Sequence, residues 1–244
     1  MQSMAQIKTN LKTLRLTSFF ENIEMKNSEA IQTQMSYIDF LLSLTQDEIE
    51  RRKERKKELL IKKSNLGKHV SILDFDFHFN PKINRREIMD LMTCEFLMKK
   101  ENIIFVGPTG VGKTFLAKAI GFEACKKENE VIFTRTAKML EYICSGHADG
   151  TYRKKLNQFI KPELLIIDDW GMTSFTNNML NIINEIISER YEEASTIITS
   201  NRPIDKWYEL FSEPVISSAL LDRLFHKCNK IIIQGKSYRQ RKII

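Results

Sequence analysis

Residues 107–114 read GPTGVGKT and match the pattern G-x-x-x-x-G-K-[ST] in full. The apolar stretch Asn102 to Val106 precedes this motif, and a helical pattern follows it. Glycines at 107, 110 and 112 let the backbone curl until successive N–H groups point at one anion, and the helix N-terminus adds its dipole. A chance glycine-rich turn seldom has this strand-loop-helix context, so the motif predicts a nucleoside-triphosphate site.

The last two residues of the motif have defined chemical roles in such a site. Lys113 can reach the β- and γ-phosphates, and the Thr114 hydroxyl can ligate Mg²⁺. The helical spacing favours a core-facing position for Phe115, as for Leu116, Ala119 and Ile120. We predict that the nucleotide contacts come from Gly107, Pro108, Thr109, Gly110, Val111, Gly112, Lys113, Thr114 and Phe115.

Short apolar runs alternate with longer helical patterns from about residue 100 onward. The helical pattern is clearest from Asn178 to Glu192. Such alternation predicts a parallel sheet that is covered by helices on both faces. The predicted strands are Asn102 to Val106, Val131 to Thr134, Leu164 to Asp168, Thr196 to Ser200 and Lys230 to Ile233.

Two adjacent aspartates, Asp168 and Asp169, end the third predicted strand. A Mg²⁺–phosphate site needs an acid on a neighbouring strand, and ligands bind at the carboxyl edge of a parallel sheet, so Asp168 is the predicted metal acid. Asp169 points differently and could polarise a water that attacks the γ-phosphate. A helix N-cap or a solvated turn carboxylate is the alternative for Asp169. We assign Trp170 and Gly171 to the turn that leaves the strand.

Asn201 and Arg223 are two further candidates. Asn201 follows the next predicted strand, where its amide could orient the attacking water, but it is also a natural turn residue before Arg-Pro. Arg223 lies late in the chain on a predicted helix. It could reach a γ-phosphate in a neighbouring subunit, or it could form a surface pair with Asp222.

The first part of the chain differs from the rest in composition. Residues 1–68 contain no proline and one glycine, and their apolar residues fall at helical spacing. We therefore divide the chain into a helical region, residues 1–68, and an α/β region, residues 69–244. The formal net charge is +7, with basic clusters at Arg51 to Lys63, Arg153 to Lys155 and Lys236 to Lys242. Each cluster could contact DNA phosphates, and for each a solvated surface is the alternative.

Targeting and metal-binding signals are weak. The sequence has no apolar stretch of the roughly 20 residues that span a bilayer and no signal-peptide pattern, so we expect a cytoplasmic protein without a membrane partner. The four cysteines include no CxxC pair and indicate reduced thiols. Cys144 and His147 are three residues apart, but without a second pair of ligands this spacing is better explained by coincidence.

With these residues placed, the chain resembles the AAA+ ATPases, and more closely the IstB-like ATP-binding helper proteins of insertion-sequence transposition, relatives of the DnaC-type helicase loaders. The resemblance covers nearly the whole chain, including ILDFDF at 72–77. The other matching segments are GPTGVGKT at 107–114, LLIIDDWG at 164–171, IITSNRP at 197–203, LLDRL at 220–224 and GKSYRQRK at 235–242.

The resemblance implies a fold and a set of roles. The fold would be a three-layer αβα P-loop NTPase with a five-stranded parallel sheet, preceded by a small helical domain for oligomerisation and DNA contact. The cofactors would be ATP and Mg²⁺, with Lys113 and Thr114 on the phosphates and metal, and Asp168 as the Walker B acid. Asn201 would be the sensor 1 residue, and Arg223 an arginine finger acting between subunits.

Two departures from the wider AAA+ pattern affect these expectations. Asp169 stands where most AAA+ modules have glutamate, so we expect slow hydrolysis. Only 21 residues follow Arg223, too few for the usual C-terminal lid, which makes a sensor 2 role for Arg239 or Arg241 doubtful.

The implied function is an oligomeric ATPase that binds double-stranded DNA through its backbone, with weak sequence preference, selects a target and stimulates a partner transposase. The alternative is a loader of a replicative helicase, whose essential partner is a protein. The basic segment RRKERKK favours transposition. A third possibility is a nucleotide-binding scaffold with negligible hydrolysis.

Overall fold

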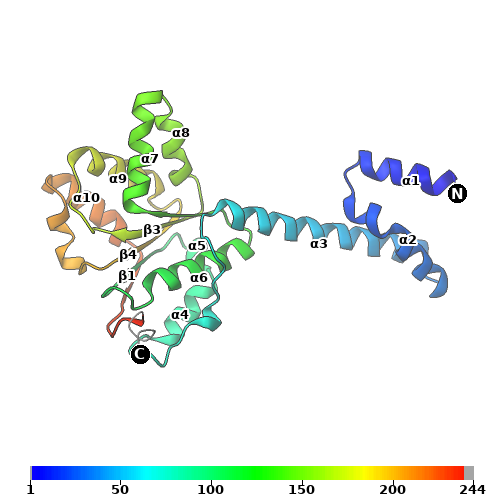
Figure 1. The fold of residues 1–244 in the computed structure, drawn as a ribbon, viewed down its shortest axis with the longest axis horizontal. Helices are drawn as coiled ribbons and strands as arrows, with labels where there is room; N and C mark the ends of the chain where they lie inside the picture. Colours follow the sequence, from blue (N-terminus) through cyan, green and yellow to red (C-terminus); the bar gives the residue numbers. More distant parts are fainter. Residues whose placement is uncertain (1, 239–244) are drawn as a thin grey trace. The chain divides into compact units, whose positions relative to one another are not determined.

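The computed structural model describes residues 2–238 and divides into two compact units after Leu59. The first unit contains α1 (Gln2–Thr13), α2 (Thr17–Gln32) and most of α3 (Tyr37–Lys63) (Figure 1). The predicted boundary lay nine residues later, between 68 and 69. The division comes earlier because Leu60, Ile61 and Leu66 pack against the core of the larger unit.

The first unit has a small core and a large exposed apolar surface. Leu11, Phe19, Ile23 and Leu44 form the buried centre of its three helices. Other apolar side chains stay in contact with solvent, including Ile38, which is 74% exposed. None of the helices in residues 2–238 is both long enough and apolar enough to cross a membrane.

A parallel sheet forms the centre of the larger unit. Its order is β2-β3-β4-β1-β5, and every pair of neighbouring strands is parallel. The strands are β1 (Asn102–Val106), β2 (Val131–Arg135), β3 (Leu164–Trp170), β4 (Ser195–Ser200) and β5 (Cys228–Ile232). The described chain therefore has the five-stranded parallel sheet that was predicted, with strand bounds that differ from the prediction by at most two residues.

Helices cover both faces of this sheet (Figure 1). Ile103 and Phe105 point to one face, and Ile104 and Val106 point to the other, as alternation along a strand requires. The first face packs against α4 (Arg85–Met92), α5 (Glu95–Met98) and α6 (Lys113–Lys126). The second packs against α7 (Thr136–Asp149), α8 (Tyr152–Ile160), α9 (Asn177–Arg190) and α10 (Pro214–Phe225). Short 3₁₀ turns lie at Ile72–Asp74, Ile204–Lys206 and Tyr208–Leu210.

The prediction that Trp170 belongs to a turn is wrong. Trp170 is the last residue of β3, is fully buried and pairs in register with Ser200. Its ring lies 5.6 Å from that of Trp207 and 5.1 Å from that of Phe175, measured between ring centroids. The strand continues past the two aspartates, and its last residue buries the Trp170 indole in the core.

The segment GHADGTY, residues 146–152, lies almost entirely in two helices. α7 continues to Asp149 and α8 begins at Tyr152, so only Gly150 and Thr151 lie between them (Figure 1). Gly150 ends α7 with a φ of 69°, the left-handed conformation that glycine favours at a helix end. The basic residues Arg153 to Lys155 consequently lie in the first turn of a helix.

A buried arginine joins the ends of several elements on the second face. The guanidinium of Arg190 donates to the carbonyl oxygens of Phe159, Ile160, Pro162 and Ser195 and to the hydroxyl of Thr196. Burial lowers the pKa of Arg190 to about 9, so the group remains charged at neutral pH.

Arg190→Met is expected to lower the free energy of unfolding by about 2–3 kcal/mol, because buried carbonyl groups would lose their donor. Urea denaturation measures this change. Arg86→Met, which removes an exposed arginine on α4, is the matched control and should leave the midpoint unchanged. Equal midpoints for the two variants would contradict the assigned role of Arg190.

Candidate functional site

The phosphate loop connects the end of β1 to the start of α6 at the carboxyl edge of the sheet. Gly110 and Gly112 have φ values of 84° and 101°, which side chains disfavour. A Cβ atom at Gly112 would also lie 2.6 Å from the Phe75 ring, and one at Gly110 would lie 2.1 Å from Ser237 Oγ. These two glycines are therefore required by the backbone conformation and by the segments that lie against the loop.

Lys113 is buried within the loop. Its Nζ donates to the carbonyl oxygens of Gly107 and Pro108 at 2.8 Å each and to Asn201 Oδ1 at 2.7 Å. An ammonium group has three N–H donors, so these three acceptors match its capacity. The structure thus brings together three of the predicted site residues, Lys113, Asn201 and Gly107.

Asp168 faces the start of α6 and is 3% exposed. Its Oδ1 accepts hydrogen bonds from Thr114 Oγ1 at 2.7 Å and from Thr199 Oγ1 at 2.5 Å. A carboxylate and a hydroxyl oxygen side by side are the hard donors that Mg²⁺ prefers, so the predicted metal pair, Thr114 and Asp168, fits the ion chemically. Thr199 was not predicted as part of this cluster.

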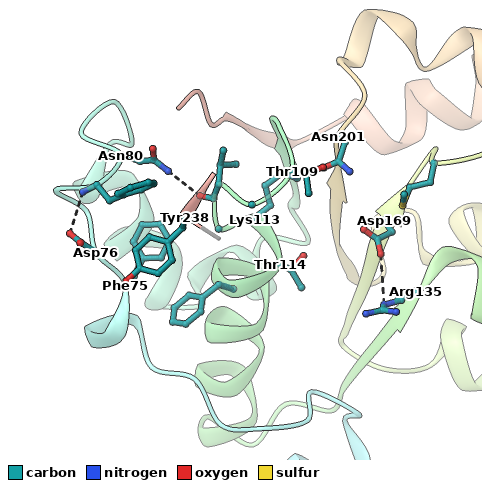
Figure 2. Close-up of a pocket in the computed structure, with 16 residues that line it drawn as sticks. Phe75, Asp76, Asn80, Thr109, Lys113, Thr114, Arg135, Asp169, Asn201 and Tyr238 are labelled. Atoms are coloured by element: carbon teal, nitrogen blue, oxygen red, sulfur yellow. Dashed lines mark hydrogen bonds and ion pairs between the residues drawn. The ribbon is translucent and has the colours of Figure 1, made fainter. Parts of the chain in front are cut away.

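Asp169 has a different environment from Asp168. Its φ is 60°, and the register of β3 against β4 shifts between Ile167 and Trp170. The irregularity directs the Asp169 side chain into a cavity, where Oδ2 lies 3.7 Å from Nε of Arg135 at the end of β2 (Figure 2). The adjacent aspartates therefore have separate positions, and Arg135 is a site residue that was not predicted.

A cavity of about 460 Å³ lies beside the phosphate loop. Loop residues from Thr109 to Phe115 line it, together with Arg135, Asp169 and Asn201 (Figure 2). Phe115 lies in the cavity wall, whereas Leu116, Ala119 and Ile120 are buried in the core. The core-facing expectation was therefore wrong for Phe115 and correct for the other three. The volume is within the usual range for a small-molecule site.

Comparison with known proteins identifies the family to which this chain belongs. The model of the family "IstB-like ATP binding protein" matches residues 9–243. The chain belongs to the IstB-like family.

Relatives from several insertion sequences match nearly the whole IstB-like chain. A protein named as the ATP-binding protein of insertion sequence IS232, from Bacillus thuringiensis subsp. berliner, is 33% identical over 97% of this chain and 95% of its own length. The corresponding protein named for IS5376, from Geobacillus stearothermophilus, is 37% identical over 85% of this chain and 82% of its own. Both names describe ATP binding, which is the property that the family shares.

Solved structures share the fold of this chain. DnaI superposes with a TM-score of 0.58 at 22% identity, covering 68% of this chain and 91% of the DnaI chain. The DnaC helicase loader superposes with a TM-score of 0.55 at 20% identity, covering 70% of this chain and 96% of the DnaC chain. AMPPCP-bound DnaA from Aquifex aeolicus superposes with a TM-score of 0.58 at 22% identity, covering 73% of this chain and 54% of the DnaA chain.

Arg223 does not contribute to the cavity of its own IstB-like chain. It lies on α10, half-buried, and its Nη1 is 3.5 Å from the carbonyl oxygen of Ala219. Within residues 2–238 it forms no ion pair with Asp222, the alternative partner that the sequence suggested.

Internal ion pairs involve many residues of the basic clusters. Arg51 pairs with Glu21, Arg153 with Glu185, and Lys155 with Asp149. Lys53, Arg55 and Lys154 are exposed and have no ion pair with any residue that the structure describes. In the third cluster Lys236 is exposed, and 239–242, with Arg239 and Arg241, lie outside the described residues. The exposed cations without ion pairs are the better candidates for contact with an anion.

The cysteines do not form a metal site. Among residues 2–238 no group of three or more His, Cys, Asp and Glu side chains is placed to hold a metal ion. His147 stacks on Tyr152, and Cys144 accepts a hydrogen bond from Asn178. Burial raises the pKa of the Cys94 thiol to about 11 and that of Cys228 to about 12, so both are protonated at neutral pH.

Proposed function

We propose that the chain is an ATP-hydrolysing, DNA-binding oligomer that assists transposition by selecting target DNA and stimulating a partner transposase. The observation that carries this proposal is the pairing of Thr114 with Asp168 beside a complete phosphate loop, in a chain whose relatives are named for insertion sequences. The helicase-loader alternative has weaker support, because DnaI and DnaC resemble the chain only in fold.

The geometry suggests how the residues would act on ATP. The Lys113 ammonium would exchange its loop carbonyl partners for the β- and γ-phosphate oxygens, which carry more charge. Thr114 and Asp168 would hold Mg²⁺, which neutralises charge that develops on the phosphates. The loop N–H groups and the α6 N-terminus would bind the remaining phosphate oxygens.

Hydrolysis would use the other side of the cavity. Asp169 would accept a proton from the attacking water, and Asn201, released from Lys113, would orient that water. The ion pair with Arg135 holds the Asp169 carboxylate, and aspartate is one methylene shorter than glutamate. Both features would make basal hydrolysis slow.

Arg135→Ala is expected to raise ATP turnover in the absence of DNA by about two- to five-fold, because a solvent-exposed ion pair contributes at most about 1 kcal/mol. Steady-state phosphate release measures it. Arg202→Ala removes another partly exposed arginine with a 3.7 Å ion pair, to Glu209, and is the control that should leave turnover unchanged. Lower turnover in Arg135→Ala would instead mean that Arg135 binds the γ-phosphate.

Arg223→Ala is expected to lower ATP turnover by about 10- to 1,000-fold while ATP binding stays within about two-fold, because the side chain lies outside its own cavity. Equilibrium dialysis and phosphate release separate the two effects. Mixing this variant with Lys113→Ala should restore part of the activity if the arginine acts between subunits. Equal loss of binding and turnover would show that Arg223 has a structural role.

The proposed function as a whole is tested by binding to duplex DNA. ATP should promote assembly of the wild-type chain on DNA, and the affinity should fall steeply with salt because the contacts are to phosphates. DNA should also raise ATP turnover. A monomer that binds DNA equally with and without ATP would refute the proposal.

A further inference from the structure

Four cations gather where the C-terminal segment meets the start of α4. We call them the loop-side patch: Lys82, Arg85, Arg86 and Lys236. All four are exposed, and none forms an ion pair with any residue between 2 and 238. The Lys82 ammonium donates to Gln234 Oε1 at 3.4 Å, although these two residues are 152 positions apart in the chain. The fold therefore assembles this patch from two distant segments.

The sequence around the loop-side patch supplies no neutralising charge. Residues 77–86 contain no aspartate or glutamate, and no acidic residue follows Asp222. Asp76, just before the first segment, lines the cavity, and its carboxylate accepts the backbone N–H groups of His78 and Phe79. The N-terminus of α4 adds partial positive charge to the same surface. Such a surface attracts a polyanion.

The two basic clusters in α3 and α8 are more nearly neutral. Glu50, Glu54 and Glu58 alternate with the basic residues of α3. Ion pairs neutralise Arg153 and Lys155 on either side of Lys154 in α8. The loop-side patch is the stronger candidate for contact with DNA, because all four of its cations keep their charge available.

The two segments that carry the patch pack against each other. A Cβ atom at Gly235 would lie 2.1 Å from Asn80 Oδ1, so the backbone of the C-terminal segment is in close contact with the Asn80 side chain. The rings of Phe79 and Tyr238 lie 5.1 Å apart between centroids. The cations of both segments are therefore held on one continuous surface.

Both segments are also hydrogen-bonded to the phosphate loop. The backbone N–H of Tyr238 donates to the carbonyl oxygen of Gly110 at 2.9 Å. The buried side chain of Asn80 donates to the carbonyl oxygen of Val111 at 3.3 Å. Figure 2 shows Asn80 and Tyr238 on the side of Lys113 that is opposite Asp169. A ligand on the patch and a phosphate on the loop would thus act on the same short stretch of backbone.

We propose that the loop-side patch binds the phosphate backbone of duplex DNA and couples this binding to the nucleotide on the phosphate loop. The inference rests on the DNA binding of the proposed function and assigns a surface to it. DNA phosphates draw on the four unpaired cations, and the hydrogen bonds to Gly110 and Val111 transmit the change to the loop. DNA reaches the nucleotide site through these two segments.

The first test measures the salt dependence of duplex DNA binding by the full chain. The double variant Arg86→Ala/Lys236→Ala removes one cation from each segment. It is expected to weaken binding about 10- to 100-fold at about 0.1 M salt and to lower the slope of log affinity against log salt by about 2. Arg86→Lys/Lys236→Arg keeps both charges and should keep the wild-type slope. Fluorescence anisotropy of labelled duplex DNA measures each affinity.

The matched control removes the same charge from the opposite edge of the sheet. Lys99 and Lys161 are exposed, and they follow α5 and α8 just before β1 and β3 begin. Lys99→Ala/Lys161→Ala should retain the wild-type slope. Equal losses of affinity and slope in the control and in Arg86→Ala/Lys236→Ala would show that DNA responds only to net charge, which would overturn the inference.

The second test measures the coupling to the nucleotide. In the wild type, DNA is expected to raise ATP turnover, and in Arg86→Ala/Lys236→Ala this rise should be lost even at DNA concentrations that saturate the variant. Full stimulation at saturation would show that the patch contributes affinity without coupling. Loss of ATP binding by the variant without DNA would show that the two cations support the nucleotide site instead.

Failure of this inference differs from failure of the proposed function. A wild-type chain that binds DNA, with an affinity and slope that Arg86→Ala/Lys236→Ala leaves unchanged, would place the DNA on another surface and overturn the inference alone. A wild-type chain that does not bind duplex DNA would refute the proposed function itself.

Discussion

Lys113→Ala is expected to lower ATP turnover by about 100-fold or more and to weaken ATP binding at the same time. The lysine is the one predicted catalytic residue whose charged atom lies inside the phosphate loop, within 2.8 Å of two loop carbonyl oxygens. Its removal takes away the cation that neutralises the β- and γ-phosphates. It also leaves the carbonyl groups of Gly107 and Pro108 without their donor, so the loop itself should relax.

The two consequences of Lys113→Ala can be measured separately. Phosphate release reports turnover, and equilibrium dialysis with labelled ATP reports binding. Lys126→Ala is the matched control, because Lys126 lies on the same helix, is exposed and pairs with Glu123 at 2.7 Å. Turnover in Lys113→Ala within about three-fold of the control would contradict the assigned role, given the ~100-fold contribution of a single charged donor.

The strands could be predicted from the sequence because each is a short apolar run between polar segments. Their order could not, since the pairing of β1 with β4 and β5 joins residues about a hundred positions apart. The end of β3 was placed too early for a local reason. Asp169 adopts a positive φ within the strand, and no periodicity predicts that the chain will return to strand geometry at Trp170.

The contact between the phosphate loop and Asp168 could be predicted because both lie at the carboxyl ends of parallel strands, although β4 lies between β1 and β3 in the sheet. Thr199 could have been found by the same reasoning. Thr199 is a polar residue near the carboxyl end of β4, two positions before the predicted site residue Asn201. In the structure Thr199 bonds to Asp168 and Asn201 bonds to Lys113.

The positions of Arg135, Phe79 and Tyr238 could not be predicted from local sequence. Arg135 ends a strand with no distinguishing motif, and it meets Asp169 only because β2 and β3 are adjacent. Phe79 and Tyr238 are 159 positions apart in the chain and meet on the phosphate loop. The resemblance included the segment of Tyr238, GKSYRQRK at 235–242, whereas ILDFDF at 72–77 ends before Phe79, and nothing in the sequence connected the two residues.

Asp168→Asn is expected to abolish the Mg²⁺ dependence of ATP binding and to lower turnover by about 100-fold or more. The carboxylate is 3% exposed and accepts two hydroxyl hydrogen bonds in the structure, from Thr114 and Thr199. Asparagine has the same shape, and because both bonds end on Oδ1, its carbonyl oxygen at that position can still accept them. The change therefore removes the charge while keeping most of the packing, and the effect is assigned to the lost charge.

The measurement for Asp168→Asn is ATP affinity with and without Mg²⁺, followed by phosphate release. In the wild type Mg²⁺ should strengthen ATP binding, and in the variant the two affinities should be equal. Asp90→Asn, at an exposed position on α4, is the control for loss of one negative charge. If Asp168→Asn kept both its Mg²⁺ dependence and its turnover, the metal would have to be held by Asp169. Asp169 would then be the metal acid. The contact between the Thr114 hydroxyl and Asp168 would then have no role in metal binding.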